Sequence, residues 1–275
     1  MGAGCWIRKV WRLMAYPSSL TDTQWQVIEK ELEIAMVSRK RIRPLRSIID
    51  GIFYVNKGGV SWRMMPLDLP PWQTVYYYYR NWRQNGFWQW LHDLLSQKVR
   101  RKQGKDASPS VAILDSQSVK TCQMGGQRGY DAAKRIKGRK RHLLVDTLGL
   151  LIVLLVHRAD IDERQGAKYL LNRLLKRIID FKRLKVFFAD QGYSGQNMKA
   201  WVAKTFYHWG CRLEIVNKIH KRSFVALPKR WIVERTFAWL SMYRRLSKDY
   251  QTDTKSSETM IQIAMIQIML NKVAK

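Results

Sequence analysis

The order of five short apolar runs after residue 106 constrains the fold of this chain more than any other feature. The runs VAILD, RHLLVDTLG and LLIVLLVH follow one another without a helical pattern between them, whereas LKVFFAD and CRLEIV each come after a helical segment. Short runs of apolar and β-branched residues are typical of strands. The sequence therefore predicts the order β-β-β-α-β-α-β-α and a mixed five-stranded sheet in an α/β domain.

Three antiparallel strands followed by alternating helices and strands form the ribonuclease-H-like arrangement, which we expect for residues 106–275. The chain then ends in SETMIQIAMIQIMLNKVAK, which reads as one more helix. We expect this helix to pack on the outside of the sheet, with its broad apolar face in the core.

Residues 16–105 have a helical pattern instead. Thr21 and Gln24 are spaced as a capping box at the start of the first helix. Helices are expected over 22–36, 45–55, 72–85 and 87–102. The stretch KQGKDASPS is rich in Gly, Ser, Pro and Lys and is typical of a linker. We therefore expect an all-helical N-terminal domain over residues 16–105, preceded by an extension over residues 1–15 to which we assign no function.

The charge of the chain points to a polyanionic partner. It has 50 Lys and Arg against 21 Asp and Glu, a net charge of +29. Nucleic acid is the partner that best fits such an excess, with ribosomal RNA or membrane lipid as alternatives. The three cysteines form no CxxC pair, which is typical of reduced thiols in the cytoplasm. No apolar run approaches the ~20 residues that cross a bilayer. We therefore expect a cytoplasmic, nucleoid-associated protein without a membrane partner.

Two of the apolar runs end in an aspartate, Asp115 after VAIL and Asp190 after VFFA. A carboxylate at the C-terminal tip of a buried strand lies at the mouth of the sheet, where α/β proteins bind ligands. Glu234, on the helix expected after Pro228, is the third candidate. Three carboxylates from separate elements can hold two metal ions for phosphodiester cleavage. Taken singly, such an Asp often only forms a turn and such a Glu often lies on the surface; together, in a basic chain, they favour a metal site.

Three other aspartates have local explanations. Asp146 lies in the sequence DTLG, where we expect it to stabilise a hairpin turn. Asp160 and Asp162 precede a helix, and we expect them to cap it. These last two are reserve candidates for metal ligands.

Basic residues surround the candidate carboxylates. Arg230 lies four residues before Glu234 and shares its helix face. The two can form an ordinary ion pair, or Arg230 can orient Glu234 and contact a DNA phosphate. Lys120 and the segment GGQRGYDAAKRIKGRKRH, with seven Lys and Arg, follow Asp115. The segment can be a solvated loop; beside Asp115 we interpret it as a contact with the substrate strand.

Several long blocks resemble a known family. LDSQSVKT, RGYDAAKRIKGRKRHLLVDTLGLL, ADQGYSG and LPKRWIVERTFAWLSMYRRLSKDY are similar to the signature blocks of DDE transposases of the insertion-sequence-five family, and FYVNKGGVSWRMMPLDLPPWQTVYYYYRNWRQNG resembles their N-terminal segment. The resemblance runs from about Tyr16 to the C-terminus. It implies DNA cleavage and joining at terminal inverted repeats with two Mg²⁺ ions, for which Mn²⁺ substitutes. It places Asp115, Asp190 and Glu234 in the catalytic, metal-binding triad.

The signature Y-(2)-R-(3)-E-(6)-K of related enzymes is matched in part. Arg230 and Glu234 fit it, whereas Leu227 and Ser241 stand at its other two positions. Arg230 is thus the fourth residue that the resemblance assigns to the catalytic site.

The expected partners are double-stranded DNA, as terminal inverted repeats and as target, and a second copy of the chain in a homodimer on DNA. DNA contacts are expected at Arg39, Lys40, Arg41, Arg43, Lys120, Arg128, Lys134, Arg135, Lys137, Arg139, Lys140, Arg141, Arg244 and Arg245. We expect residues 16–105 to bind the element ends, with dimerisation as the alternative role.

Two other functions are open on the sequence alone. One is a catalytically inactive derivative that occupies transposon ends, and the other is a ribonuclease-H-like nuclease such as a junction resolvase. The three carboxylates favour an active transposase over the inactive derivative. The large helical N-terminal domain argues against the resolvase.

Overall fold

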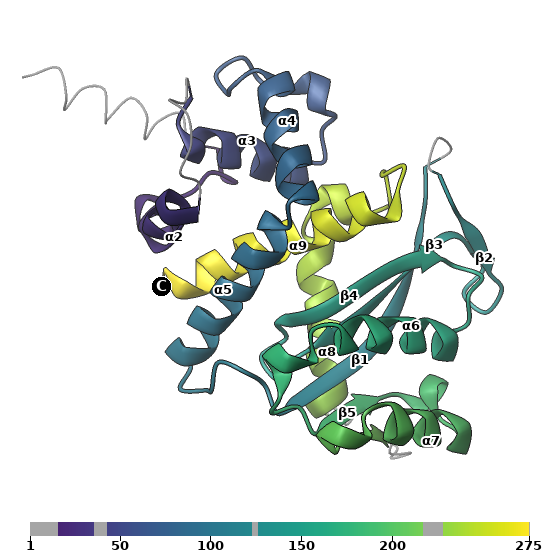
Figure 1. The fold of residues 1–275 in the computed structure, drawn as a ribbon. Coiled ribbons are helices and arrows are strands. Elements are labelled where there is room, and N and C mark those ends of the chain that lie inside the picture. The colour runs from purple at the N-terminus through teal and green to yellow at the C-terminus, as the bar shows by residue number, and fades with distance from the viewer. Residues whose placement is uncertain (1–15, 36–42, 123–125, 217–227, 275) are drawn as a thin grey trace, which may run out of the picture.

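A computed structural model describes residues 16–35, 43–122, 126–216 and 228–274 of the chain (Figure 1). The extension over residues 1–15 and the predicted DNA contacts Arg39, Lys40 and Arg41 lie outside these ranges. The helices are α2 (Asp22–Ala35), α3 (Leu45–Gly58), α4 (Trp72–Gln84), α5 (Phe87–Lys102), α6 (Glu163–Leu175), α7 (Gln196–Thr205), α8 (Pro228–Ser241) and α9 (Thr254–Val273). Short 3-10 turns are η1 (Trp62–Met64), η2 (Ile178–Phe181), η3 (Gln191–Tyr193), η4 (Tyr207–Trp209) and η5 (Arg244–Leu246).

One mixed sheet organises the second half of the chain. Its strands are β1 (Val111–Lys120), β2 (Gly129–Asp131), β3 (Ile136–Val145), β4 (Leu151–Arg158), β5 (Val186–Ala189) and β6 (Arg212–Ile215). β3 pairs antiparallel with β1 and β4, and β5 pairs parallel with β1 and β6. The predicted ribonuclease-H-like order is confirmed. A sixth strand joins the predicted five because β2, only three residues long, pairs with the start of β3.

Helices cover both faces of the sheet. α6 and α7 lie on one face and α8 on the other (Figure 1). Successive residues of β1 point to opposite faces, as strand geometry requires. Ala112 and Leu114 are buried in the cluster with α6 and α7, whereas Ile113 is buried in the cluster with α8 and α9. Both faces of the first half of β1 are thus covered, which explains why residues 111–114 are all apolar, whereas mostly polar residues follow from Asp115 onward.

The four N-terminal helices form where the sequence predicts them. The capping box of α2 is present, because the Thr21 amide donates to Gln24 Oε1 at 3.0 Å and the Gln24 amide donates to Thr21 Oγ1 at 3.2 Å. α3 continues three residues beyond its predicted end and stops at Gly59, whose φ of 74° needs a residue without a Cβ. None of the helices in the described parts of the chain is long and apolar enough to cross a membrane.

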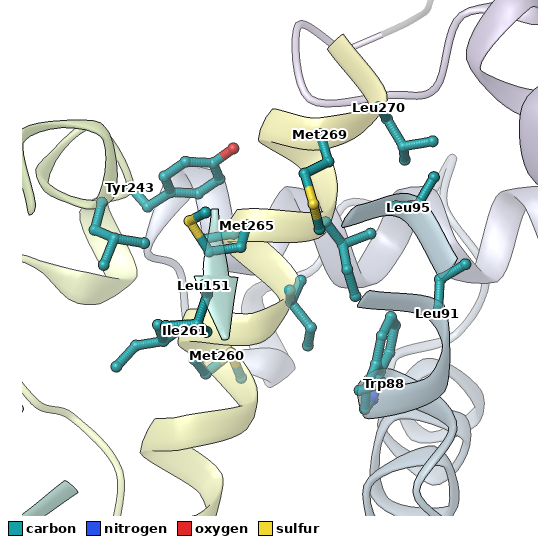
Figure 2. Packing of buried hydrophobic residues seen from close by; sticks show 14 of the residues in the cluster. Trp88, Leu91, Leu95, Leu151, Tyr243, Met260, Ile261, Met265, Met269 and Leu270 are labelled. Carbon is teal, nitrogen blue, oxygen red and sulfur yellow. The ribbon is translucent and has the colours of Figure 1, made fainter. Parts of the chain in front are cut away.

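The position of α9 corrects the sequence prediction. α9 does not pack on the outside; it lies between α5 and the sheet (Figure 1). In Figure 2, Leu91 and Leu95 of α5 face one side of α9, and Leu151 of β4 lies beside Met265 on another side. Each of these side chains is at most 3% exposed. The N-terminal helices and the sheet therefore share one core through α9, although the linker near residue 105 separates them along the chain.

Candidate active site at the sheet edge

Asp115 lies in the middle of β1 and not at its tip. The prediction of a strand-terminal carboxylate is wrong here because β3 continues to pair with β1 as far as Lys120. On the other side of β1, pairing with β5 ends at Ile113. Asp115 is therefore two residues beyond the last bond to β5, where that flank of β1 opens. Its Oδ1 accepts a hydrogen bond from the Ser116 amide at 2.7 Å.

Asp190 follows the last residue of β5, as predicted. Its Oδ1 accepts the Gly192 amide at 2.9 Å, which fixes the carboxylate over the turn η3. Asp115 and Asp190 are both half-buried. They line one crevice between the sheet edge and α8. The crevice is lined by Ile113, Leu114, Asp115, Phe188, Ala189, Asp190, Val216 and Val233.

A third carboxylate that the sequence did not identify, Glu163, lies beside these two. It is the first residue of α6, and its Oε1 accepts from Ser116 Oγ at 3.2 Å and from Lys134 Nζ at 3.0 Å. A Cβ placed on Gly192 would lie 2.5 Å from Glu163 Oε2 and 3.1 Å from Asp190 Oδ1. Gly192 therefore lies between these two carboxylates, and a side chain at this position would displace the end of Glu163. We call Asp115, Asp190 and Glu163 the carboxylate site.

Gly166 explains how Glu163 reaches this position. A Cβ on Gly166 would lie 2.0 Å from His142 Cε1 and 2.6 Å from His157 Nε2. The two histidines are buried and stand 3.0 Å apart, between His142 Nδ1 and His157 Nε2. α6 therefore lies against the sheet more closely than any larger residue would permit. A glycine inside a helix is unfavourable by ~1 kcal/mol, so Gly166 was the available sequence signal of this close approach.

The carboxylate site carries a net negative charge. Burial raises the pKa of Asp115 to about 7; the Ser116 amide opposes this, and the charges of Asp190 and Glu163 add to it. Among the described residues, Lys134 is a cation whose charge lowers the Asp115 pKa. Three carboxylates beside one lysine are unusual in a chain with a net charge of +29.

A divalent cation fits this site in donor type and charge. Carboxylate oxygens are the hard ligands that Mg²⁺ and Mn²⁺ bind, and a cation would offset the repulsion between the carboxylates. Tyr193 adds a buried hydroxyl close to Ser116, without a hydrogen-bond partner of good geometry among the described residues. Within the described ranges, no three Asp, Glu, His or Cys side chains already stand close enough to hold an ion.

Glu234 lies on α8, the helix that borders the crevice, but is not one of the residues that line it. It follows Val233, which lines the crevice, and its side chain is exposed. α8 is held in place by the β3–β4 turn, because Thr236 Oγ1 donates to the Gly149 carbonyl at 2.9 Å and Arg235 donates to the Leu148 carbonyl at 3.1 Å. The backbone of Arg230 belongs to the first turn of α8, and its side chain lies outside the described part of the structure.

The three other aspartates have structural partners. Asp146 stabilises the hairpin turn as predicted: it accepts the Leu148 and Leu150 amides and pairs with Arg100. Asp162 caps α6 as predicted, accepting two amides of its first turn at 2.8 and 3.1 Å. Asp160 does not cap the helix, because its carboxylate pairs with Arg158 at 2.5 Å.

The predicted DNA contacts fall into two groups. The exposed ones are Arg43, Lys120, Arg128, Lys134, Arg135, Lys137 and Arg244. Arg139, Lys140 and Arg141 are each at most 4% exposed, which corrects their prediction as DNA contacts. The residues of β3 are buried from Gly138 onward, whereas Lys137 near the start of the strand is exposed.

Each buried cation has internal partners. Arg139 pairs with Asp249 at 3.2 Å, Lys140 with Asp131 at 3.5 Å, and Arg141 donates to a backbone carbonyl of η5. Arg245, half-buried, donates to the Val60 carbonyl at 3.1 Å.

Comparisons with known proteins identify two transposase family models that match this chain. Residues 106–269 match the family model described as Transposase DDE domain, and residues 20–92 match the model described as Putative transposase of IS4/5 family. The Insertion element IS402 uncharacterized 16.2 kDa protein of Burkholderia cepacia is 33% identical over 86 residues. That alignment covers 30% of this chain and 57% of the length of the relative.

Among solved structures, the Mos1 transposase paired-end complex with left transposon end aligns over 84% of this chain and 75% of that chain. With a TM-score of 0.24 and 10% identity, this likeness is too weak to carry an argument. The family models carry the assignment, because the first alone spans more than half of the 275 residues. The chain belongs to the DDE transposases of the IS4/5 type.

Proposed function

We propose that this transposase binds the ends of its insertion element and performs metal-dependent strand cleavage and strand transfer with Asp115, Asp190 and Glu234. The observation that carries the proposal is the carboxylate site: two strand-borne aspartates share one crevice with α8, and the residue after Val233 on that helix is Glu234. The net negative charge of the site calls for cations that the described residues do not supply.

Each residue has a distinct role in this proposal. Asp115 and Asp190 hold the cations from the sheet side, and Glu234 closes the site from α8. When bound, two Mg²⁺ ions polarise the scissile phosphate and activate the attacking oxygen. Lys134 and Ser116 orient Glu163 by hydrogen bonds to its carboxylate. The negative charge of Glu163 in turn raises the pKa of Asp115. Arg230 precedes Glu234 by one helical turn and is proposed to contact the phosphate beside it.

Exposed cations extend the proposed DNA surface outward from the site. Lys120 ends β1, and Arg128, Arg135 and Lys137 lie on the β2–β3 hairpin that follows it. The carboxylates of Asp249 and Asp131 pair with the buried cations Arg139 and Lys140. We expect the affinity for duplex DNA to fall steeply as the salt concentration rises, because each phosphate contact releases counterions from the DNA.

The test compares the wild-type chain with Asp115→Asn. Asn keeps the shape of the side chain and removes its charge, so cleavage of element-end DNA in Mg²⁺ should fall at least about a hundredfold, while gel-shift affinity for the same DNA stays near wild type. Cleavage at a near wild-type rate by the variant contradicts the assignment. If the wild-type chain also binds the ends without cutting them, the chain is an inactive derivative that occupies transposon ends.

We propose that the N-terminal helices recognise the element ends. Arg43 precedes α3, and Arg80 is exposed on α4 next to the exposed Tyr77. Deleting the region is not a usable test because α9 would lose the core that it shares with α5. The double substitution Arg43→Gln, Arg80→Gln should instead weaken end-specific binding and leave the molecular mass in solution unchanged. A change in mass with unchanged binding supports the dimerisation role.

A further inference from the structure

A second recess, distant from the carboxylate site along α8, has a different chemistry. It is a groove of about 860 Å³ where the ends of α3, α5, α8 and α9 meet the β3–β4 turn. We call it the basic groove. It is lined by Lys57, Val99, Lys102, Gln103, Leu148, Arg235, Trp239, Met242, Tyr243, Ile268, Asn271 and Lys272.

The lining combines cations with apolar surface. Four of its residues are Lys or Arg, and none of the lining residues is acidic. Trp239 makes cation–π contacts with two of the cations. The Arg235 guanidinium lies 4.8 Å from its ring centroid, and Lys272 Nζ lies 4.5 Å from it. Tyr243 holds a third, with Lys57 Nζ 4.3 Å from its ring. Contacts of this kind restrict the positions of charged heads, so less freedom is lost when they bind an anion.

The apolar part of the groove is open to solvent at its rim. Met242 is 65% exposed, and Leu148 and Ile268 are half-buried beside it. In Figure 2, Tyr243 stands next to Met265 of α9, so the rings of the groove rest on the main core. A rigid apolar wall next to positive charge suits a ligand that is anionic on one side and flat and apolar on the other.

We propose that the basic groove binds a segment of unpaired DNA strand. An unpaired strand presents both phosphates and exposed base faces, which match the cations and the apolar wall of the groove. Duplex DNA presents phosphates on its outside and keeps its base faces stacked inside, so it leaves the apolar wall unused. In an acidic protein segment only some residues carry a flat ring, whereas every nucleotide of an unpaired strand carries both a phosphate and a base.

The groove and the proposed catalytic residues share one helix. Arg235 stacks on Trp231 as well as on Trp239, at 4.8 Å from each ring, and these three residues form a row along α8. Trp231 is 48% exposed and lies three residues before Glu234. The row thus lies on the helix that contributes Val233 to the crevice and Arg235 and Trp239 to the groove. The inference rests on the proposed function for the source of the unpaired strand, since cleavage of the two strands at different positions leaves an unpaired end.

The experiment measures binding and not cleavage, so that it is independent of catalysis. The full-length chain carrying Asp115→Asn is titrated against a fluorescein-labelled oligothymidylate of ~12 nucleotides, followed by fluorescence anisotropy. The test substitution is Met242→Asp, which places a negative charge at the rim of the groove. Its control is Ile179→Asp, because Ile179 is 73% exposed and lies outside the groove lining.

A second pair of variants removes positive charge. Lys57→Gln with Lys102→Gln lowers the charge of the groove by two, and Lys176→Gln with Lys182→Gln makes the same change at exposed positions outside it. Each groove variant should weaken oligothymidylate binding about tenfold relative to its control, while affinity for blunt element-end duplex changes less than about threefold.

Three results overturn the inference. The first is an equal effect of groove and control variants, and the second is a loss of duplex binding alone. The third is a change of oligomeric state caused by the groove variants, which would assign the groove to a second copy of the chain. A wild-type chain that binds oligothymidylate through the groove but never cuts DNA contradicts the proposed function and leaves the groove assignment intact.

Discussion

On β3, Arg139 is buried among groups that neutralise its charge. On the neighbouring strand β1, the half-buried Asp115 lies beside two groups of its own charge. Arg139 is 0% exposed, pairs with Asp249 at 3.2 Å, and donates to Ser257 Oγ at 3.0 Å and to backbone carbonyls at 2.8 to 2.9 Å. Asp115 has Asp190 and Glu163 as neighbours and one lysine near them. We call Arg139, Asp249 and Ser257 the Arg139 cluster.

This difference suggests two roles for charged side chains. The charges of the Arg139 cluster stabilise the fold, whereas those of the carboxylate site are available to bind a ligand. A buried ion is tolerated when hydrogen bonds and an opposite charge replace its water, as in the Arg139 cluster. In the carboxylate site, Lys134 pairs with Glu163 at 3.0 Å, and the described residues supply no ion pair to Asp115 or Asp190. Removing charge should therefore have opposite consequences in the two places, and the following predictions test this contrast.

The largest effect on stability is expected for Arg139→Gln. Removing one partner of a buried pair leaves Asp249 uncompensated, which typically costs about 3–5 kcal/mol. Urea unfolding should show this loss, whereas the exposed Lys137→Gln should change stability by less than about 0.5 kcal/mol. An equally stable Arg139→Gln variant would show that the buried arginine is dispensable and would remove one side of the comparison.

Glu234→Gln should have a large effect on activity and a small one on stability. The side chain is exposed, so the variant should unfold within about 0.5 kcal/mol of the wild type, while Mg²⁺-dependent cleavage falls about a hundredfold, or ~3 kcal/mol in barrier. Cleavage and thermal unfolding are measured on one preparation. A folded and fully active variant excludes Glu234 from the site, and Glu163, which lies beside Asp115 and Asp190, becomes the next residue to test.

Gly166→Ala tests whether the close approach of α6 positions Glu163. The added methyl group meets His142, and such overpacking costs about 1–3 kcal/mol. The matched control is Gly58→Ala, whose new Cβ has nothing nearer than 3.9 Å. Cleavage per folded molecule should fall for Gly166→Ala only. If both variants behave alike, the approach of α6 does not matter to the site.

These residues also show which parts of the site the sequence could predict. Strand order and the two aspartates follow from the apolar runs that precede them. Glu163 could not be identified because Asp160, Asp162 and Glu163 stand together in the sequence, and only the packing of Gly166 decides which of them faces Asp115. Arg139 was predicted to contact DNA because it belongs to a strongly basic run, and such a run is usually exposed to solvent. The sequence alone does not show that this part of the run lies on a buried strand.

Asp50 provides a buried carboxylate far from the chemistry and the smallest predicted effect. Burial raises its pKa to about 6, against the opposing effects of the Leu20 amide and Arg46. A raised pKa in the folded state means that its contribution to stability is present below about pH 4 and is lost as pH rises through about 6. Asp50→Asn should therefore be more stable than the wild type by about 1–2 kcal/mol at pH 8 and not at pH 4. Parallel stability curves for the two proteins from pH 4 to 8 would contradict this.

The central claim is that the carboxylate site is kept for a divalent cation, and thermal unfolding with added Mg²⁺ tests it most directly. A ligand that binds only the folded state raises the unfolding temperature, by about 5 °C at a hundredfold excess over Kd. The account predicts this rise for the wild-type chain and its absence in Asp115→Asn, Asp190→Asn, with NaCl of equal ionic strength as the control for screening. An equal rise in both proteins, or none in either, would contradict the account.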